Sequence, residues 1–398
     1  MAATVAATTI GLTACGDDDN GGGVTPPPPP PAPEIALWEG TDIKGTIDTE
    51  MTGETGKITL DATKTYDLSG NLFVEDGATL IIPAGTRIEA SAGFESYILV
   101  LQGGKIEIAG TAAAPVTMTA KGATAAGAWG GLVINGKAPL AGGGTASTEI
   151  NSDYEYGGTD EADNSGSITY LTLEYTGAKN SANIEHNGLT LNGVGNGTKI
   201  ENVFVPNSAD DGIEFFGGSV NVTNLLVINS DDDMFDFTQG YTGTLTNAYG
   251  LWESGMSSGE SDPSGVEADG NFDGNFPAHT GQSDFTIAGV TFDLRMDYNA
   301  TESAYRLQNV LRIRRGATAT ITNALVRGIG RAENLINLSD GKGDANTATA
   351  IALTDELTTP ADVTFLPAGK EADYTEVSVA TGNTGATTAP FAWTGYTF

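Results

Sequence analysis

Ile200-Glu-Asn202-Val-Phe-Val205 is the stretch that decides the fold, because close copies of it recur along the chain. Val222-Thr-Asn224-Leu-Leu-Val227 follows after 22 residues, and Leu245-Thr-Asn247 follows after 23 more. Ile321-Thr-Asn323-Ala-Leu-Val326 repeats the pattern further on. Each copy alternates apolar residues around an asparagine, which is typical of a short strand beside a turn. Recurrence of one short strand at a nearly fixed interval indicates a repeat architecture.

Shorter repeats run in step with this pattern. Gly188-Leu-Thr-Leu191, Gly212-Ile-Glu-Phe215 and Asp233-Met-Phe-Asp236 form a second series, and Leu80-Ile-Ile82 recurs as Ile106-Glu-Ile108 after 26 residues. Two or three short strands per repeat predict one coil of a parallel β-helix, whose coils stack about 4.8 Å apart. We therefore predict an all-β fold, a single-stranded right-handed parallel β-helix (solenoid) with capped ends. A leucine-rich repeat is the rival prediction, but its Leu-x-x-Leu-x-Leu pattern is missing.

Four asparagines occupy one position of the repeat, namely Asn202, Asn224, Asn247 and Asn323. Asparagine tolerates the left-handed backbone conformation of tight turns, and stacked asparagines can hydrogen-bond through their amides. We predict a structural role for this column.

The repeat also divides the chain. We predict a β-helix domain over residues 35–345, including an N-terminal cap, and a C-terminal cap over 346–398. Two stretches rich in Asp and Glu interrupt the repeat, at about 141–166 and about 253–284. We predict that both are long acidic loop insertions, and loops on a rigid scaffold commonly carry binding sites.

The overall charge excludes some classes of protein. The 398 residues include 18 Lys and Arg against 51 Asp and Glu, a net charge of −33 at pH 7. Nucleic-acid binding is excluded, because phosphate contacts need a basic surface. Hydrophobic residues make up 39% of the chain, which is enough for a packed core.

The only cysteine lies near the start, in Leu12-Thr13-Ala14-Cys15. This stretch resembles a bacterial lipobox, in which the cysteine becomes the lipidated first residue. Asp17-Asp18-Asp19 resembles the export signal of surface lipoproteins in Gram-negative bacteria of the Bacteroidota type. Residues 1–14 contain no Lys or Arg, whereas a signal peptide begins with a positive region. We predict a signal remnant and lipobox over residues 1–15, with lipidation at Cys15.

A Gly- and Pro-rich segment follows the cysteine. Gly21-Gly22-Gly23 and the run Pro26 to Pro31 predict an extended, semi-rigid tether over residues 16–34. The predicted location is the cell outer membrane, with the folded part lipid-anchored and surface exposed.

Three further motifs carry a family resemblance. Trp129-Gly-Gly-Leu-Val-Ile-Asn-Gly-Lys-Ala-Pro139, Asp210-Asp-Gly-Ile-Glu-Phe-Phe-Gly-Gly218 and Gly265-Val-Glu-Ala-Asp-Gly-Asn271 resemble bacterial surface lipoproteins with a pectin-lyase-like β-helix. The resemblance covers roughly residues 60–340. It implies the fold and the surface location, but no activity, since that group is largely uncharacterised.

One acidic loop has the spacing of a calcium site. Asp269, Asn271 and Asp273 alternate before a glycine, and alternating oxygen ligands at a tight turn suit a hard cation. Thr280 stands where an EF-hand would have Glu, which argues against a full EF-hand. The alternatives are a calcium loop completed by Glu267 or another coil, and a solvated acidic loop.

A second metal site is predicted between coils. Asp210-Asp211 and Asp231-Asp232-Asp233 are 21 residues apart, so adjacent coils would stack these carboxylates. Like charges at such distances repel unless a cation lies between them. Calcium bound by Asp211 and Asp232 is one interpretation. Plain turn residues and catalytic acids are the others.

Positive charge gathers near the end of the repeat, in the six arginines Arg306, Arg312, Arg314, Arg315, Arg327 and Arg331. Strand alternation in Leu311-Arg312-Ile313-Arg314 points both arginines away from the core. They form a candidate ligand-binding site for an anion or a sugar carboxylate. Neutralisation of neighbouring acidic coils is the alternative, and a lyase base is a third.

These features favour a cell-surface-anchored lipoprotein whose β-helix rod is a non-catalytic glycan-binding, adhesive or structural module stabilised by calcium. The expected partners are the outer membrane and a polysaccharide. The alternative is a polysaccharide lyase or glycoside hydrolase of pectin-lyase-like fold. No residue is assigned a catalytic role, because neither His186 nor His279 lies in a matching motif.

Overall fold

The computed structural model describes residues 34–182, 184–297, 302–359 and 363–398. The predictions for Cys15, the lipobox and most of the tether lie outside these ranges. No helix within them is long and apolar enough to cross a membrane.

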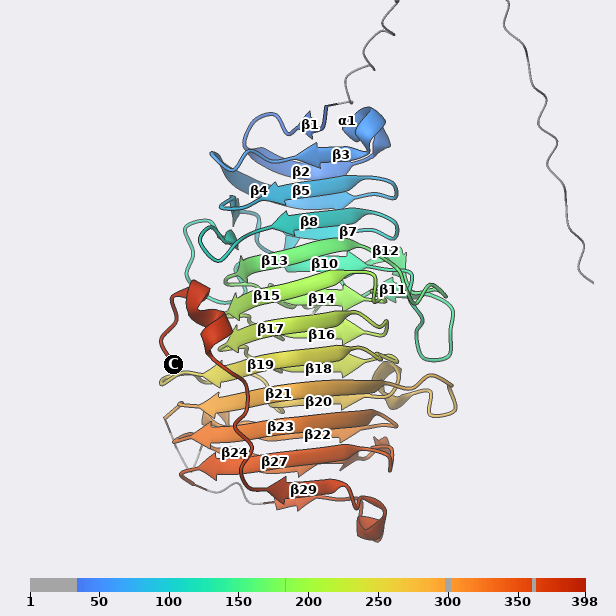
Figure 1. Cartoon of the computed structure of the whole chain (residues 1–398), viewed down its shortest axis with the longest axis vertical. Helices are drawn as coiled ribbons and strands as arrows, with labels where there is room; N and C mark the ends of the chain where they lie inside the picture. Colours follow the sequence, from blue (N-terminus) through green and yellow to red (C-terminus); the bar gives the residue numbers. More distant parts are fainter. Residues whose placement is uncertain (1–33, 183, 298–301, 360–362) are drawn as a thin grey trace, which may run out of the picture. The chain divides into compact units, whose positions relative to one another are not determined.

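The described residues from Ile35 onward form a stack of coils built on a 27-stranded, mostly parallel sheet (Figure 1). The strands follow three faces. The first face contains β1 (Ala36–Leu37), β3 (Lys57–Thr59), β5 (Thr79–Pro83), β8 (Lys105–Ala109) and, at the far end, β29 (Val377–Ala380). Between them it takes the first halves of seven long strands: β13 (Gly166–Leu173), β15 (Lys199–Pro206), β17 (Asn221–Ile228), β19 (Thr244–Trp252), β21 (Asp284–Leu294), β23 (Thr318–Gly328) and β27 (Ala350–Leu357).

The second face consists of the first halves of β2 (Asp42–Ile47) and β4 (Thr65–Val74), then β6 (Arg87–Ala90), β9 (Val116–Ala120) and the second halves of the seven long strands. The third face continues from the ends of β2 and β4 through β7 (Tyr97–Val100), β10 (Gly131–Asn135), β14 (Leu189–Asn192), β16 (Ile213–Phe216), β18 (Phe235–Thr238), β20 (Ser264–Asp269), β22 (Leu307–Arg314), β24 (Ala332–Asn337) and β28 (Val363–Phe365). This parallel stack confirms the predicted β-helix.

The bend between the first and second faces is the predicted asparagine column. Asn202, Asn224, Asn247 and Asn323 have φ values of 58°, 58°, 55° and 51°. Asn224 Nδ2 donates to Asn202 Oδ1 at 3.0 Å, and Asn247 Nδ2 donates to Asn224 Oδ1 at 2.8 Å. The predicted amide ladder is therefore confirmed over these three coils.

The interior is filled by the inward residues of all three faces. Ile200, Val222 and Leu245 lie under one another and are almost fully buried. Phe215 stacks on Phe237, and Phe237 stacks on Phe285, with ring centroids 4.9 and 4.3 Å apart. A continuous column of stacked apolar side chains makes each coil depend on its neighbours.

The two predicted insertions differ in structure. The first contains the hairpin of β11 (Ala146–Thr148) and β12 (Asn151–Tyr156), a separate antiparallel sheet. The second was predicted as one loop over about 253–284, and this is wrong in part, because β20 within it pairs with β18 and β22 as a regular third-face strand. Val266 and Ala268 of β20 are fully buried in the interior of the stack. The 3₁₀ turn η3 (Phe272–Gly274) follows.

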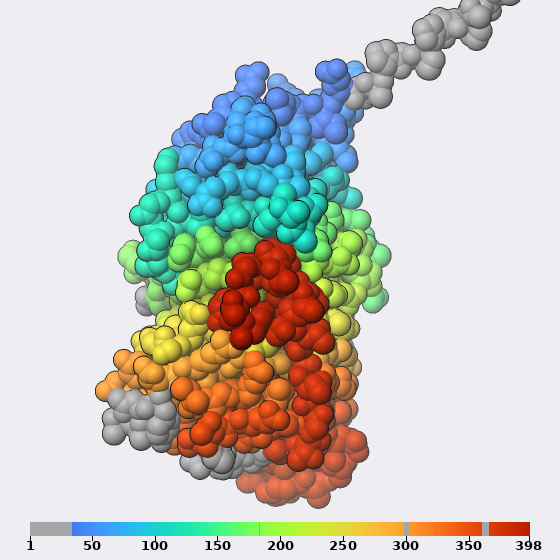
Figure 2. Space-filling view, turned by 60° about the vertical axis from the view of Figure 1, so that its left-hand side comes forward, coloured from blue at the N-terminus to red at the C-terminus, as the bar shows by residue number. Residues whose placement is uncertain are grey.

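The C-terminal segment does more than cover an end. β27 and β29 continue the stack, and the residues after β29 run back along the outside of the coils (Figure 2). Asn323 Oδ1 accepts from the N–H of Thr384 at 2.8 Å. Phe391, in η6 (Ala389–Thr394), is fully buried against Phe204 and other outward residues of the second face. The segment acts as a strap across several coils.

The remaining short elements lie in the connections: α1 (Thr49–Thr52), η1 (Gly53–Thr55), η2 (Gly93–Glu95), η4 (Ser303–Tyr305), β25 (Ser339–Asp340), β26 (Gly343–Asp344) and η5 (Glu371–Asp373).

Candidate functional site

A groove crosses the third face between hairpin β11–β12 and the segment that contains η3. It consists of two adjoining cavities of about 400 and about 320 Å³. Both are lined by Ser147 and Tyr156 of the hairpin, by Gln239 after β18, and by Phe272 of η3. Tyr156 donates its hydroxyl to Gln239 Oε1 at 2.8 Å, which fixes the hairpin over the coil.

The larger cavity is the aromatic end of the groove. Phe272 and Phe276 are 55% and 44% exposed, unusual values for phenylalanine. The rings of Phe276 and His279 stack with centroids 4.7 Å apart and planes within 6°. Exposed aromatic side chains at the mouth of a cavity are typical of a ligand-binding surface.

The smaller cavity is the acidic end, and strand register creates it. Glu214, Asp236, Glu267 and Arg312 occupy the same outward position on β16, β18, β20 and β22. Parallel strands without offset place these side chains one coil apart, so the three carboxylates stack beside one another.

Two further acids form a hydrogen-bonded column at the turn before these strands. The backbone N–H of Asp233 donates to Asp211 Oδ1 at 2.9 Å, and that of Ser264 donates to Asp233 Oδ1 at 2.6 Å. Asp211 and Asp233 are buried. One oxygen of each therefore holds successive coils together, which matches the interpretation of these residues as turn residues.

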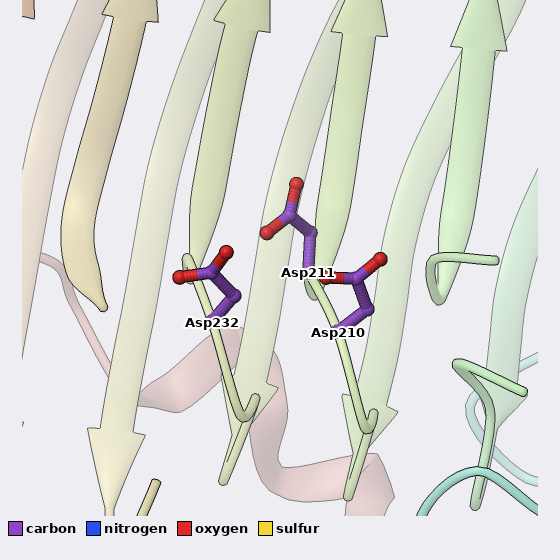
Figure 3. A group of neighbouring side chains, drawn as sticks. All are labelled: Asp210, Asp211 and Asp232. Carbon is purple, nitrogen blue, oxygen red and sulfur yellow. The ribbon is translucent and has the colours of Figure 1, made fainter. Parts of the chain in front are cut away.

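Asp211 also belongs to two groups of carboxylates. One oxygen from each of Asp210, Asp211 and Asp232 lies within 4.8 Å of the other two (Figure 3), and the same holds for one oxygen from each of Asp211, Glu214 and Asp236. We call these five residues the acidic cluster. The structure thus brings together Asp211 and Asp232, as the spacing predicted, and calcium binding there stays a prediction.

The surroundings of the acidic cluster disfavour the ionised form of its carboxyl groups. Burial, followed by the charge of neighbouring carboxylates, raises the pKa of Asp232 to about 8. The same causes raise the pKa values of Asp210, Asp211, Glu214 and Asp236 well above their ordinary values. Asp236 Oδ1 is buried and has no hydrogen-bond partner among the described residues. The cluster would gain stability from protons or from a cation.

The next coils carry the opposite arrangement, which we call the arginine clasp. Arg312 pairs with Asp262 and Glu267, and Arg314 pairs with Glu267, Asp269 and Asp340. Arg315 pairs with Asp269, Asp273 and Asp340. Both predicted ligand-binding arginines point away from the core, but their side chains are only 12% and 5% exposed. This geometry matches the neutralisation alternative for Arg312, while Arg314 also lines the smaller cavity.

The predicted calcium loop is part of this clasp. Asp269 Oδ1 accepts from Arg314 Nε at 2.8 Å, and Asp273 Oδ1 accepts from Arg315 Nη1 at 2.6 Å. Asn271 Oδ1 accepts from the N–H of Phe276 at 2.8 Å. Arg315 Nη1 also donates to Asp269 Oδ2 at 2.6 Å, so arginines already contact both carboxylates of this loop. Metal binding by Asp269, Asn271 and Asp273 stays a prediction.

Several groove residues were absent from the sequence predictions. Glu214 and Asp236 align only once the register of the third face is known. Tyr156, Phe272 and Phe276 belong to the interrupting loops, and nothing in their sequence shows that these loops fold over the same face. The strand alternation around Phe215 and Phe237 was the one available signal, since it places Glu214 and Asp236 outward.

Comparison with known proteins confirms the fold. A family model described as a pectate-lyase-like β-helix domain matches residues 51–396. No curated protein and no solved structure matches the chain. Because the family model spans most of its length, the chain belongs to the pectate-lyase-like β-helix family. Membership gives the architecture, and it does not by itself give an activity.

Proposed function

We propose that this protein is a surface-anchored, non-catalytic module that binds a glycan in the groove between hairpin β11–β12 and η3. The observation that carries the proposal is the exposed aromatic pair Phe272 and Phe276 beside a cavity lined by carboxylates. Sugar rings present apolar faces and many hydroxyls, so they fit a site that combines aromatic faces with hydrogen-bonding groups.

The charge of the groove selects among glycans. Glu149, Glu214, Asp236 and Glu267 line the smaller cavity with Arg314 and Arg315. Carboxylates repel polyuronates, and the net charge of −33 adds to that repulsion at long range. A neutral polysaccharide is therefore the favoured ligand, unless bound cations offset the charge.

Calcium is the proposed cofactor, at Asp210, Asp211 and Asp232. Support comes from one oxygen of each residue, and these oxygens lie within 4.8 Å of one another on two adjacent turns. Hard cations prefer such oxygen ligands. The geometry favours this group over Asp269, Asn271 and Asp273, because arginines already occupy the carboxylates of that loop.

The location and the coil handedness belong to the same proposal. Lipidation of Cys15 and an extended tether would hold the rod away from the outer membrane, and the Leu12–Cys15 motif supports this. Replacement of Cys15 by Ser should release the protein from the membrane fraction of a Gram-negative host. We take the coils to be right-handed, because crossovers between parallel strands are almost always right-handed.

A polysaccharide hydrolase or lyase is the second candidate, and one observation favours it. Glu214 and Asp236 bring two carboxyl groups together in an open cavity that also contains Tyr156 and Arg314. Paired carboxyl groups of different pKa are the catalytic groups of most glycosidases. In this candidate, Glu214 and Asp236 would supply the acid and the base.

One experiment separates the two candidates. The full chain with Cys15 replaced by Ser is incubated, with and without calcium, with xylan, a neutral β-glucan and polygalacturonate. Size exclusion reports chain length, and calorimetry reports binding. Binding without shortening, abolished by Phe272→Ala with Phe276→Ala, supports the module. Ile329→Ala is the control, because Ile329 is a 59% exposed apolar residue outside the groove. If the polysaccharide chains are shortened by the parent protein and are not shortened by Asp236→Asn, the result would support the enzyme instead.

A further inference from the structure

Hairpin β11–β12 forms one wall of the groove, and Ile150 and Tyr154 pack it against apolar residues of the coils beneath it. Among the described strands, β11 and β12 pair only with each other. Asn135 Nδ2 donates to Thr148 Oγ1 at 2.5 Å, and Tyr156 donates to Gln239. The turn between β11 and β12 places Glu149 beside the loop that precedes β14, which contains Glu185 and Asn187.

A small cavity of about 10 Å³ lies at this junction. Six of its eight lining residues carry a side-chain oxygen: Thr148, Glu149, Glu185, Asn187, Thr190 and Asn192. A volume of this size corresponds to roughly one water-sized sphere. An oxygen-rich shell around a space for one small particle is the surrounding that a hard cation such as calcium requires.

Asn187 provides an independent observation. Its side chain is only 4% exposed, and its Nδ2 donates to Glu214 Oε2 at 2.6 Å. Its Oδ1 has no hydrogen-bond partner among the described residues. Buried carbonyl oxygens are almost always paired, so an unpaired one beside two glutamates indicates a missing positive partner.

The charges around the cavity agree with this. Glu149 and Glu185 both line it, and Lys179 pairs with Glu185 from the outside. Lys179 does not line the cavity, and its side chain is 45% exposed. One carboxylate charge therefore stays without an opposite charge at the junction.

We infer that this junction binds a hard divalent cation, calcium, between Glu149 of the hairpin and Glu185 and Asn187 of the coil loop. The ion would fasten the hairpin to the coils and so hold one wall of the groove in place. This site is separate from the group Asp210, Asp211 and Asp232, and it does not depend on the identity of a glycan.

The test is made without any glycan. Calcium binding is measured by calorimetry in a chain that carries Asp211→Asn and Asp232→Asn, which removes the other proposed site. Hydrogen exchange of residues 146–156 is followed in the same samples. We expect one bound calcium, and exchange of the hairpin amides slowed roughly tenfold when calcium is ten times its dissociation constant. Exchange in β17 serves as the internal reference.

Glu149→Gln and Glu185→Gln are introduced singly and together, and they should abolish both the bound calcium and the slowed exchange. Glu149 is exposed, so we expect its replacement alone to leave the fold intact. Glu155→Gln is the matched control, because Glu155 is an exposed glutamate on the same hairpin and does not line the cavity. The inference would be overturned if the chain with both replacements still bound calcium. It would also be overturned if calcium did not change the exchange rate of the hairpin amides in the parent chain.

Discussion

The acidic cluster and the arginine clasp lie on neighbouring coils. They differ in whether a positively charged side chain neutralises their carboxylates. In the clasp, Arg312, Arg314 and Arg315 form ion pairs with the carboxylates of Asp262, Glu267, Asp269, Asp273 and Asp340. In the described part of the chain, no Lys or Arg pairs with a carboxylate of the acidic cluster, and the nearest such pairs involve Glu185 and Glu267.

The two regions use the same scaffold position. Glu214, Asp236, Glu267 and Arg312 are in register on four consecutive third-face strands. The fold can therefore place a neutralising arginine here, and it does so on one coil only. Among the described residues, the acidic cluster has no such arginine on the neighbouring coils. We therefore expect a bound cation or bound protons to balance its negative charge.

The largest expected effect comes from opening the clasp. Arg314→Met leaves Glu267, Asp269 and Asp340 without their shared, 5% exposed guanidinium. Removing one partner of a buried ion pair costs about 3–5 kcal/mol. Chemical denaturation at pH 7 should show that loss in the free energy of unfolding. Glu267→Gln added to Arg314→Met should restore part of the lost free energy. If Arg314→Met had the same unfolding free energy as the parent chain, the clasp would not contribute to stability.

The acidic cluster should respond to calcium where the clasp does not. Calcium at a hundred times its dissociation constant should stabilise the chain by about 2.7 kcal/mol per site. Melting with calcium and with chelator measures this shift. Asp211→Asn with Asp232→Asn should remove it from this site, while the amide oxygen introduced by Asp211→Asn can still accept from the N–H of Asp233. An unchanged shift in that variant would place the ion elsewhere.

The acidic cluster and three of the clasp carboxyls should also give opposite dependences of stability on pH in calcium-free buffer. Folded carboxyls of the cluster have raised pKa values, and that of Asp232 is about 8. They bind protons more tightly than the unfolded chain does, so stability should fall as pH rises from about 4 to about 8. A difference of about 1–2 kcal/mol between pH 5 and pH 8 is expected, because each pKa unit corresponds to about 1.4 kcal/mol and half-buried groups feel only part of it.

Three carboxyls of the clasp, those of Asp262, Asp273 and Asp340, have lowered pKa values and give the reverse slope, whereas burial raises the pKa of Glu267. Burial opposes ionisation of Asp340, but the N–H of Lys342 and the Arg315 guanidinium outweigh it and hold the pKa of Asp340 below its ordinary value. Its contribution is present above the unfolded pKa near 4 and is lost as pH falls below it. Denaturation between pH 3 and 8 measures both slopes. Asp232→Asn should reduce only the fall in stability between about pH 4 and pH 8. A parent chain whose stability did not change over that range would contradict the raised pKa values in the cluster.

Repetition explains which features could be predicted from sequence. The asparagine column and the approach of Asp211 to Asp232 follow from a nearly constant spacing. Glu214 and Asp236 were missed because they differ in type between coils, so no repeated letter marks them. The strand β20 was hidden by flanking Gly and Asp, which are typical of loops.

Features that depend on contacts between distant segments could not be predicted. Strand alternation correctly directed Arg312 and Arg314 outward, but acids from the preceding strand and the loops around it surround them there. The aromatic end joins Tyr156 of the hairpin to Phe272 of a loop more than a hundred residues later. Single-sequence patterns contain no record of such packing between loops.

The smallest expected effect lies within the clasp itself and tests whether burial or pairing matters. Lys342 pairs with Asp273, as Arg315 does, but the side chains of Lys342 and Asp273 are 45% and 48% exposed. Solvent screening limits exposed ion pairs to roughly 0–1 kcal/mol. Lys342→Gln should therefore change the unfolding free energy by less than about 1 kcal/mol, and added salt should leave its small effect close to zero. If Lys342→Gln lowered the unfolding free energy as much as Arg314→Met, the number of ion pairs would explain the stability of the clasp. Burial of the arginines would then not be needed to explain it.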